Sequence, residues 1–132
     1  MNDAAAGAAS GRAVRVMLVE DNDTFRETLE LLFGMREGID VVASVASGDE
    51  AAEVCARLKP DVVLMDYRMP GLNGAEATRA VLRACPATKV VCLTASVTPR
   101  EVAEVLAAGA VACVTKDEDF DRIVATVREA ST

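Results

Sequence analysis

Short apolar runs alternate five times with segments of helical periodicity from Val14 onward. The runs are rich in β-branched residues, and the central ones are apolar at consecutive positions, as in strands that are buried on both faces. Helices between successive strands are typical of parallel sheets. The sequence therefore predicts an α/β fold, a doubly wound five-stranded parallel sheet with helices on both faces. The predicted strands are residues 14–20, 39–45, 61–66, 89–95 and 110–115.

The segments between these runs carry helix start and stop signals. Asn22 or Asp23 can cap the first helix. The second and third helices end before Pro60 and Pro86, because proline disfavours helical backbone in the preceding residue. The fourth ends at Gly109. The first and last helices each have one apolar face, formed by Phe25, Leu29, Leu32 and Phe33 and by Phe120, Ile123, Val124 and Val127.

The length of 132 residues fits one domain with a sizeable core. We expect a flexible tail over residues 1–13 and a single domain over residues 14–130. The net charge is −7, whereas nucleic-acid-binding domains typically carry a basic surface. No run is long and apolar enough to span a bilayer, and the first residues lack a signal-peptide pattern. We therefore expect a cytoplasmic domain that binds neither nucleic acid nor membrane.

The cysteines argue against a zinc site. They form no CxxC pair, and the chain has no histidine to complete a ligand set. All lie in or beside apolar stretches, so reduced and buried thiols are the expectation. The four are Cys55, Cys85, Cys92 and Cys113.

Polar side chains collect where the predicted strands end. Glu20 and Asp21 close the first strand, and Asp66 closes the third. Thr94 lies at the end of the fourth strand, and Lys116 follows the fifth. Ligands of doubly wound sheets bind beyond the carboxyl ends of the strands. Three adjacent carboxylates repel one another unless a cation joins them, and hard oxygen ligands favour Mg²⁺.

These residue types suit phosphoryl transfer. Asp66 can act as a nucleophile toward an in-line phosphoryl group, while Lys116 neutralises phosphoryl oxygens and Thr94 donates its hydroxyl. The loop "YRMPGLNG" after Asp66 turns the chain sharply, so that a backbone carbonyl can face the metal. Gly71 and Gly74 permit the φ values that such a turn needs.

Each of these residues also has an ordinary structural explanation. Glu20 and Asp21, taken alone, fit the start of a helix as well as a metal site. Asp66 after a strand can be a turn former, Thr94 a capping hydroxyl and Lys116 a solvated lysine. Their common placement at one edge of the predicted sheet favours a shared site, because chance would scatter them over both edges.

Four motifs, "LVEDN", "LMDYRMPGLNG", "LTAS" and "VTKD", occur in an order and spacing that resembles the receiver domain of bacterial two-component response regulators. The resemblance covers about residues 14–130. It implies the flavodoxin-like (βα)5 topology of the CheY-like superfamily. "MPGLNG" and "KD" most resemble the NarL/LuxR class, which usually carries a helix-turn-helix output domain and regulates transcription.

The resemblance also implies roles for the residues at matching positions. Asp66 would accept a phosphoryl group from a phosphohistidine on a partner kinase, with Thr94 as the switch hydroxyl and Lys116 beside them. The chain has no histidine of its own, so the donor is another molecule. The implied Mg²⁺ ligands are Glu20, Asp21, Asp66 and the main-chain carbonyl of Arg68.

Cys113 departs from the family pattern. The fifth strand of the family usually carries tyrosine or phenylalanine three residues before the lysine, and that ring turns inward on activation. A thiol is small and cannot make this movement. Two explanations stay open: signalling through the loop after Thr94 and the fourth helix alone, or a cysteine that only fills core volume.

Several functional alternatives follow from the same residues. An Mg²⁺-dependent phosphatase with Asp66 as nucleophile needs a carboxylate two residues later, where this chain has Arg68. A pure interaction module would lack the pocket residues, which are all present. No GxxxxGK[ST] loop indicates ATP binding. We expect a regulatory phospho-acceptor with self-phosphorylation and self-dephosphorylation as its only activities, and not an enzyme in the usual sense.

Assembly is left open by the sequence. No helix-turn-helix follows the last predicted helix, so the chain is either a stand-alone receiver or part of a longer regulator. Homodimerisation on phosphorylation is implied by the resemblance alone. The outer face of the last helix suits a salt-bridged interface or solvent exposure, with exposure favoured. Its charges are Asp121, Arg122, Arg128 and Glu129.

Overall fold

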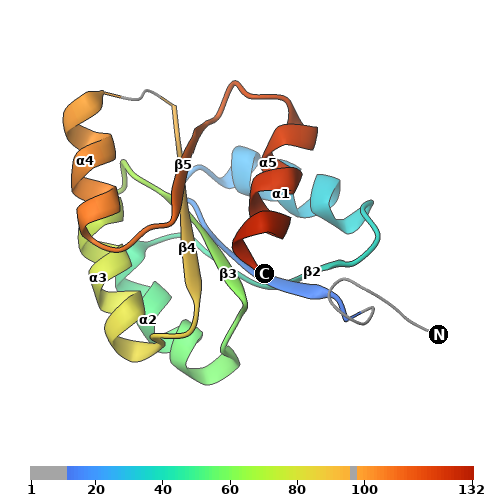
Figure 1. The fold of residues 1–132 in the computed structure, drawn as a ribbon, viewed down its shortest axis with the longest axis horizontal. Helices are drawn as coiled ribbons and strands as arrows, with labels where there is room; N and C mark the ends of the chain where they lie inside the picture. Colours follow the sequence, from blue (N-terminus) through green and yellow to red (C-terminus); the bar gives the residue numbers. More distant parts are fainter. Residues whose placement is uncertain (1–11, 96–97) are drawn as a thin grey trace.

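The computed structural model describes residues 12–95 and 98–132, and it places one sheet between two layers of helices (Figure 1). All strands are parallel, in the flavodoxin-like order β2-β1-β3-β4-β5, which confirms the predicted fold class. Most of the predicted tail, residues 1–11, lies outside the described residues. The elements are β1 (Val14–Val19), α1 (Asp23–Gly34), β2 (Ile39–Val45), α2 (Gly48–Leu58), β3 (Val62–Asp66), α3 (Gly74–Ala84), β4 (Lys89–Thr94), α4 (Pro99–Ala107), β5 (Ala112–Thr115) and α5 (Phe120–Ala130).

The sheet divides the apolar core into two parts. α1 and α5 cover one face, and α2, α3 and α4 cover the other (Figure 1). Successive residues of a strand point to opposite faces, so Leu64 of β3 packs under α1 and α5, while Val63 and Met65 pack under α2, α3 and α4. All five residues of β3 are buried because both faces of this central strand are covered.

Side chains cap three of the helices at their first turns. Asn22 accepts a hydrogen bond from the backbone N–H of Phe25 at 2.8 Å, so the predicted cap of α1 is Asn22. Asn73 and Glu76 form a reciprocal capping box at the start of α3. Thr98 caps α4. Each such cap contributes about 1 kcal/mol to helix stability.

The fifth strand begins two residues later than predicted. Gly109 has a φ of +116°, and the N–H of Ala110 donates to the carbonyl of Val105 at 3.1 Å, so these residues still close the end of α4. Val111 then bonds to the carbonyl of Val90, and the strand starts at Ala112. The first, third and fourth strands each differ from the predicted ranges by one residue at an end.

Gly71 and Gly74 have different roles in the loop after β3. Gly71 has a φ of +78°, as predicted for a turn. The same prediction for Gly74 is wrong, because Gly74 is the first residue of α3 and has no positive φ. A Cβ at this position would lie 2.7 Å from the carbonyl oxygen of Asp66 and 2.7 Å from the Cα of Tyr67. Gly74 therefore permits a close approach of α3 to the end of β3.

The cysteines are free thiols. Cys55, Cys85 and Cys92 are buried as predicted, whereas Cys113 is half-buried. Within the described part of the chain, no helix combines the length and the apolar character that crossing a bilayer requires.

Candidate functional site

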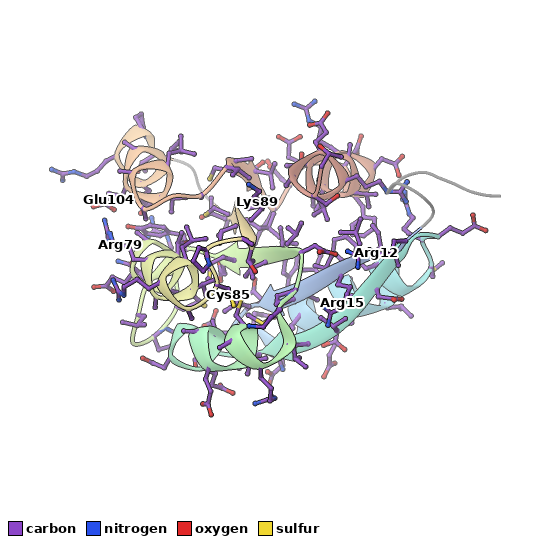
Figure 2. The ribbon with its side chains drawn as sticks, turned by 60° about the horizontal axis from the view of Figure 1, so that its bottom comes forward. Arg12, Arg15, Arg79, Cys85, Lys89 and Glu104 are labelled. Atoms are coloured by element: carbon purple, nitrogen blue, oxygen red, sulfur yellow. The ribbon has the colours of Figure 1, made fainter. Side chains whose placement is uncertain are left out.

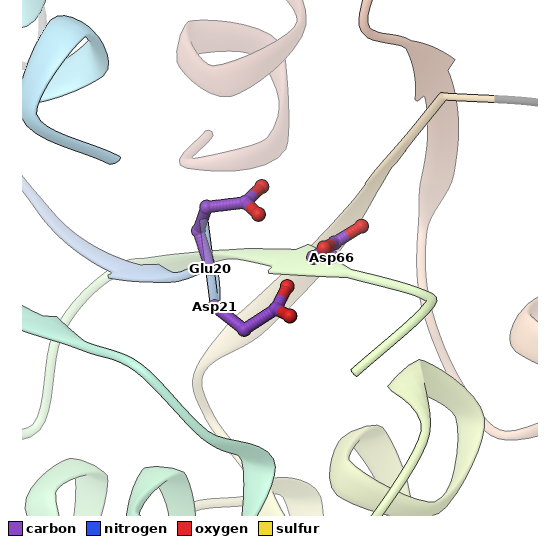
Figure 3. A group of neighbouring side chains, drawn as sticks. All are labelled: Glu20, Asp21 and Asp66. Carbon is purple, nitrogen blue, oxygen red and sulfur yellow. The ribbon is translucent and has the colours of Figure 1, made fainter. Parts of the chain in front are cut away.

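Three carboxylates meet at the carboxyl edge of the sheet (Figure 3). Glu20 and Asp21 follow β1, and Asp66 is the last residue of the neighbouring strand β3. Each offers one oxygen, and these oxygens lie within 4.8 Å of one another. Glu20 and Asp66 are only 2% and 5% exposed, whereas Asp21 is exposed. The prediction that parallel strand ends bring these side chains together is confirmed.

The crowding of carboxylates changes the acidity of Asp66. Burial, and then the neighbouring Glu20 carboxylate, raise the pKa of Asp66 from 3.8 to about 7, although Lys116 opposes this rise. The site therefore holds more negative charge than its own lysine compensates. A bound cation would relieve this excess.

Lys116 joins the site from the end of β5. Its ammonium nitrogen lies 2.7 Å from Glu20 Oε1 and 3.4 Å from Asp66 Oδ2, and its side chain is 19% exposed. The same nitrogen lies 4.7 Å from the centroid of the Phe25 ring, a cation–π distance. These contacts hold the lysine beside the carboxylates and exclude the solvated-lysine alternative.

Thr94 lies at the carboxyl end of β4, where it is 2% exposed. Its carbonyl accepts a hydrogen bond from the backbone N–H of Lys116 at 2.8 Å. β4 lies next to β3, with Leu93 opposite Asp66. Thr94 thus belongs to the same edge as the carboxylates. The loop that follows it, which carries the signal in one of the two explanations left open for Cys113, includes residues 96–97, which lie outside the described residues.

The loop after Asp66 connects the site to α4. The Arg68 guanidinium pairs with Glu101 of α4 at 2.7 Å, so only its main-chain carbonyl is left for the predicted role at a metal. The Tyr67 hydroxyl donates to Glu104 Oε1 of α4 at 2.5 Å, and Glu104 is labelled on this helix in Figure 2. This hydrogen bond and burial raise the pKa of Tyr67 to about 12.

Sequence reasoning did not identify the residues that surround Glu20. The Asn22 N–H donates to Glu20 Oε2 at 3.0 Å, and Arg26 donates to the Glu20 carbonyl at 2.8 Å. Phe25, assigned to an apolar helix face, lies beneath Lys116. Their position in the sequence could have identified them, because the first turn of a helix that directly follows a strand must pass close to the end of that strand. Tyr67 was also missed, although it directly follows Asp66.

The donor set fits a hard divalent cation. Three carboxylate oxygens within reach of one ion, two from buried residues, match the oxygen ligands that Mg²⁺ takes in proteins. The raised pKa of Asp66 is a second sign that added positive charge would be favourable here. The acidic group could therefore hold a metal ion.

Comparisons with known proteins identify related chains. The family model for the response regulator receiver domain matches residues 16–128. The chain is 40% identical over 114 residues to the transcriptional regulatory protein LnrK of Bacillus subtilis, a match to 86% of this chain and 52% of LnrK. It is 35% identical over 116 residues to the response regulator GacA of Pseudomonas aeruginosa, a match to 88% of this chain and 54% of GacA. The chain spans about half the length of these curated relatives.

A solved structure has the same fold. The two-component response regulator of the LuxR family from Aurantimonas sp. SI85-9A1 superposes with a TM-score of 0.86 at 32% identity, over 90% of this chain and 85% of that chain. The family model covers far more than half of the sequence. This chain therefore belongs to the response regulator receiver domain family.

Proposed function

We propose that this domain is a phosphorylation-controlled switch in which Asp66 is the phospho-acceptor. The observation that carries the proposal is the buried Asp66 carboxylate at the carboxyl edge of the sheet, beside two other carboxylates and 3.4 Å from the Lys116 ammonium. This arrangement supplies a carboxylate as nucleophile and a cation for the charge that an incoming phosphoryl group brings.

The proposed reaction transfers a phosphoryl group from a histidine of a partner kinase. A carboxylate oxygen of Asp66 attacks phosphorus in line with the P–N bond, the P–O bond forms, and the imidazole nitrogen leaves with the electron pair of the broken bond. Lys116 pairs with one phosphoryl oxygen, and Thr94 donates its hydroxyl to another. Later attack of water on phosphorus returns free Asp66 and phosphate, and small phosphoryl donors can replace the kinase.

Glu20, Asp21, Asp66 and the carbonyl of Arg68 would hold Mg²⁺ in this reaction. Bound Mg²⁺ would supply positive charge that offsets the carboxylates and the phosphoryl oxygens. The exposed Asp21 leaves one side of the site open to solvent and to a phosphoryl donor.

The partners and the output are also proposals. A sensor histidine kinase is the donor, and the domain works in the cytoplasm. The transcriptional regulatory protein LnrK extends beyond the matched region, which supports control of transcription by a helix-turn-helix domain outside this chain. The alternative is a stand-alone receiver that acts by protein contact. Homodimerisation on phosphorylation is tested by size-exclusion chromatography with and without beryllium fluoride and Mg²⁺.

A phosphatase of the aspartyl-phosphate type is less well supported. Such an enzyme needs a general acid two residues after the nucleophile. That position is Arg68, whose guanidinium is paired with Glu101 of α4 and cannot donate a proton at neutral pH.

The test is incubation with acetyl phosphate and Mg²⁺, followed by intact mass measurement. Wild-type protein should gain the mass of one phosphoryl group, and Asp66→Asn should gain none. Asp40→Asn, a change of an exposed aspartate on β2, is the matched control and should behave as wild type. Phosphorylation of the Asp66→Asn variant would contradict the proposal.

A further inference from the structure

Two cysteines stand side by side in the sheet. Cys92 of β4 and Cys113 of β5 are direct register partners in a parallel pair. Neighbouring strands lie about 4.8 Å apart, and register partners in a parallel pair point to the same face. Both side chains accordingly belong to the core under α2, α3 and α4.

The two thiols differ in their surroundings. The neighbouring Cys113 thiol and burial raise the pKa of Cys92, and the neighbouring Cys92 thiol lowers the pKa of Cys113. The Glu101 carboxylate of α4 acts against ionisation of both. Cys92 is only 1% exposed, whereas Cys113 is half-buried. Cys113 is therefore the more accessible of the two residues, and Cys92 is enclosed.

We propose that Cys92 and Cys113 form a reversible oxidation site that closes to an intramolecular disulfide when a low-molecular-weight disulfide reacts with it. The register pairing and the unequal exposure carry this inference. None of these observations depends on phosphorylation of Asp66, so the inference stands apart from the proposed function.

The chemistry is a pair of thiol–disulfide exchanges. The Cys113 thiol loses its proton, and its sulfur attacks one sulfur of the small disulfide, which releases one small thiolate. The Cys92 thiolate then attacks the Cys113 sulfur of this mixed disulfide and releases the second small thiolate. The two protons from the cysteines end on the two released thiols. The protein is oxidised by two electrons, and the small disulfide is reduced by two.

The position in the sheet favours easy reversal. The Cα separation expected for adjacent strands lies within the range of about 4.4–6.8 Å seen in disulfides. Register partners in a parallel pair stand side by side, however, so their Cβ atoms must be drawn together to reach about 3.8 Å. Strained disulfides are the readily reduced ones. The bond would fasten β4 and β5 just before Thr94 and Lys116.

The other two cysteines provide a comparison inside the same molecule. Cys55 of α2 and Cys85 at the end of α3 also lie close together, and the thiol of Cys85, which is labelled in Figure 2, donates to the Cys55 carbonyl at 3.1 Å. Both are buried, and burial raises the pKa of Cys55 to about 11. This pair lacks a member that a solute can reach, and it should stay reduced.

The experiment treats the folded, fully reduced chain with oxidised glutathione, then traps free thiols and measures intact mass and peptide maps. We expect the free thiol count to fall from four to two, with the Cys92 and Cys113 peptides joined and no glutathione retained. Cys92→Ser should stop at a mixed disulfide on Cys113, and Cys113→Ser should not react. Cys85→Ser, whose hydroxyl can still donate to the Cys55 carbonyl, should form the same Cys92–Cys113 bond as wild type.

Three outcomes would overturn the inference. Wild-type protein that keeps all four thiols lacks an oxidation site. Wild-type protein that retains glutathione on Cys113 lacks a second thiol able to displace it. A bond between Cys55 and Cys85 in place of the expected one places the reactive pair elsewhere. Treatment with excess dithiothreitol should restore four thiols, and failure to do so would contradict reversibility.

Discussion

Lys116 illustrates how much one side chain contributes to the site. Its ammonium pairs with both buried carboxylates and is backed by the Phe25 ring. Removal of this cation leaves Glu20 and Asp66 facing each other without an ion-pair partner among the residues that the structure describes. The lysine therefore opposes the rise in the pKa of Asp66, and in the proposed reaction it also pairs with a phosphoryl oxygen.

We expect Lys116→Ala to slow phosphorylation by acetyl phosphate by roughly a hundredfold, the usual effect of removing one preorganised charge contact. The fold should persist, because the side chain lies at the edge of the sheet. Rates come from intact mass at timed intervals, and circular dichroism checks the fold. Lys89→Ala, an exposed lysine at the start of β4, is the control. An unchanged rate in Lys116→Ala would remove the proposed phosphoryl contact.

A second residue-scale prediction concerns pH. Asp66 has a pKa of about 7 in the folded chain, compared with an ordinary value of 3.8 that applies to the unfolded chain. Between these values the folded chain keeps a proton that the unfolded chain has lost, so the free energy of unfolding falls as the pH rises. Without metal, Asp66→Asn should be more stable than wild type at about pH 8, by on the order of 2 kcal/mol.

The stability advantage of Asp66→Asn should shrink at about pH 5, where folded wild-type Asp66 is protonated. Urea unfolding in the presence of EDTA at the two pH values measures it. An advantage of equal size at both pH values would show that burial of the Asp66 charge is not its source.

At the scale of elements, the loop after β3 and helix α4 are joined by polar contacts. The Tyr67 hydroxyl donates to Glu104, and Arg68 pairs with Glu101. Both loop residues directly follow Asp66. These contacts connect the two residues that follow Asp66 to α4, and no aromatic ring on β5 takes part.

Tyr67→Phe keeps the buried ring and removes only the hydroxyl. We expect a loss of about 1 kcal/mol in the free energy of unfolding and faster amide exchange in α4. Glu104→Ala, which removes the acceptor, should have a similar effect, and the double variant should be less destabilised than the sum of the two. Urea unfolding and hydrogen exchange measure these effects. Full additivity would mean that the hydrogen bond contributes nothing.

The close approach of α3 to β3 makes Gly74 intolerant of a side chain. We expect Gly74→Ala to destabilise the domain by about 2 kcal/mol, because its Cβ would meet backbone atoms that cannot move aside. Gly34→Ala is the matched control, since a Cβ at the end of α1 meets nothing within 4 Å. Urea unfolding compares them. Equal stability of the two variants would contradict the packing argument.

Much of the element order followed from periodicity, but two kinds of detail did not. The start of β5 was predicted too early because the N–H of Ala110 still donates to the carbonyl of Val105 in α4. No local sequence pattern predicts this hydrogen bond. The role of Gly74 was misassigned because its constraint comes from the packing of α3 on Asp66 and Tyr67, a contact between elements. The candidate site residues could be predicted because the carboxyl ends of parallel strands lie at the same edge of the sheet. Phe25 and Tyr67, which contact Lys116 and α4, were not predicted because their side chains are typical of core residues.

At the scale of the whole molecule, metal binding should change global stability. A ligand that binds only the folded state stabilises it by about 2.7 kcal/mol at a hundredfold excess over its dissociation constant. We expect MgCl₂ to raise the melting temperature of wild type and of Asp40→Asn, and EDTA to reverse the rise. Asp66→Asn should respond much less. NaCl at matched ionic strength is the control, and an equal rise with NaCl would contradict a specific site.

The division of the core by the sheet has a consequence for how such a molecule can diversify. Side chains under α1 and α5 share no packing surface with those under α2, α3 and α4, because the strands stand between them. A change of volume on one side, such as a thiol in place of a ring at Cys113, needs no matching change on the other. The helices on one face of the sheet can thus change their side chains and binding partners while the packing on the other face stays the same.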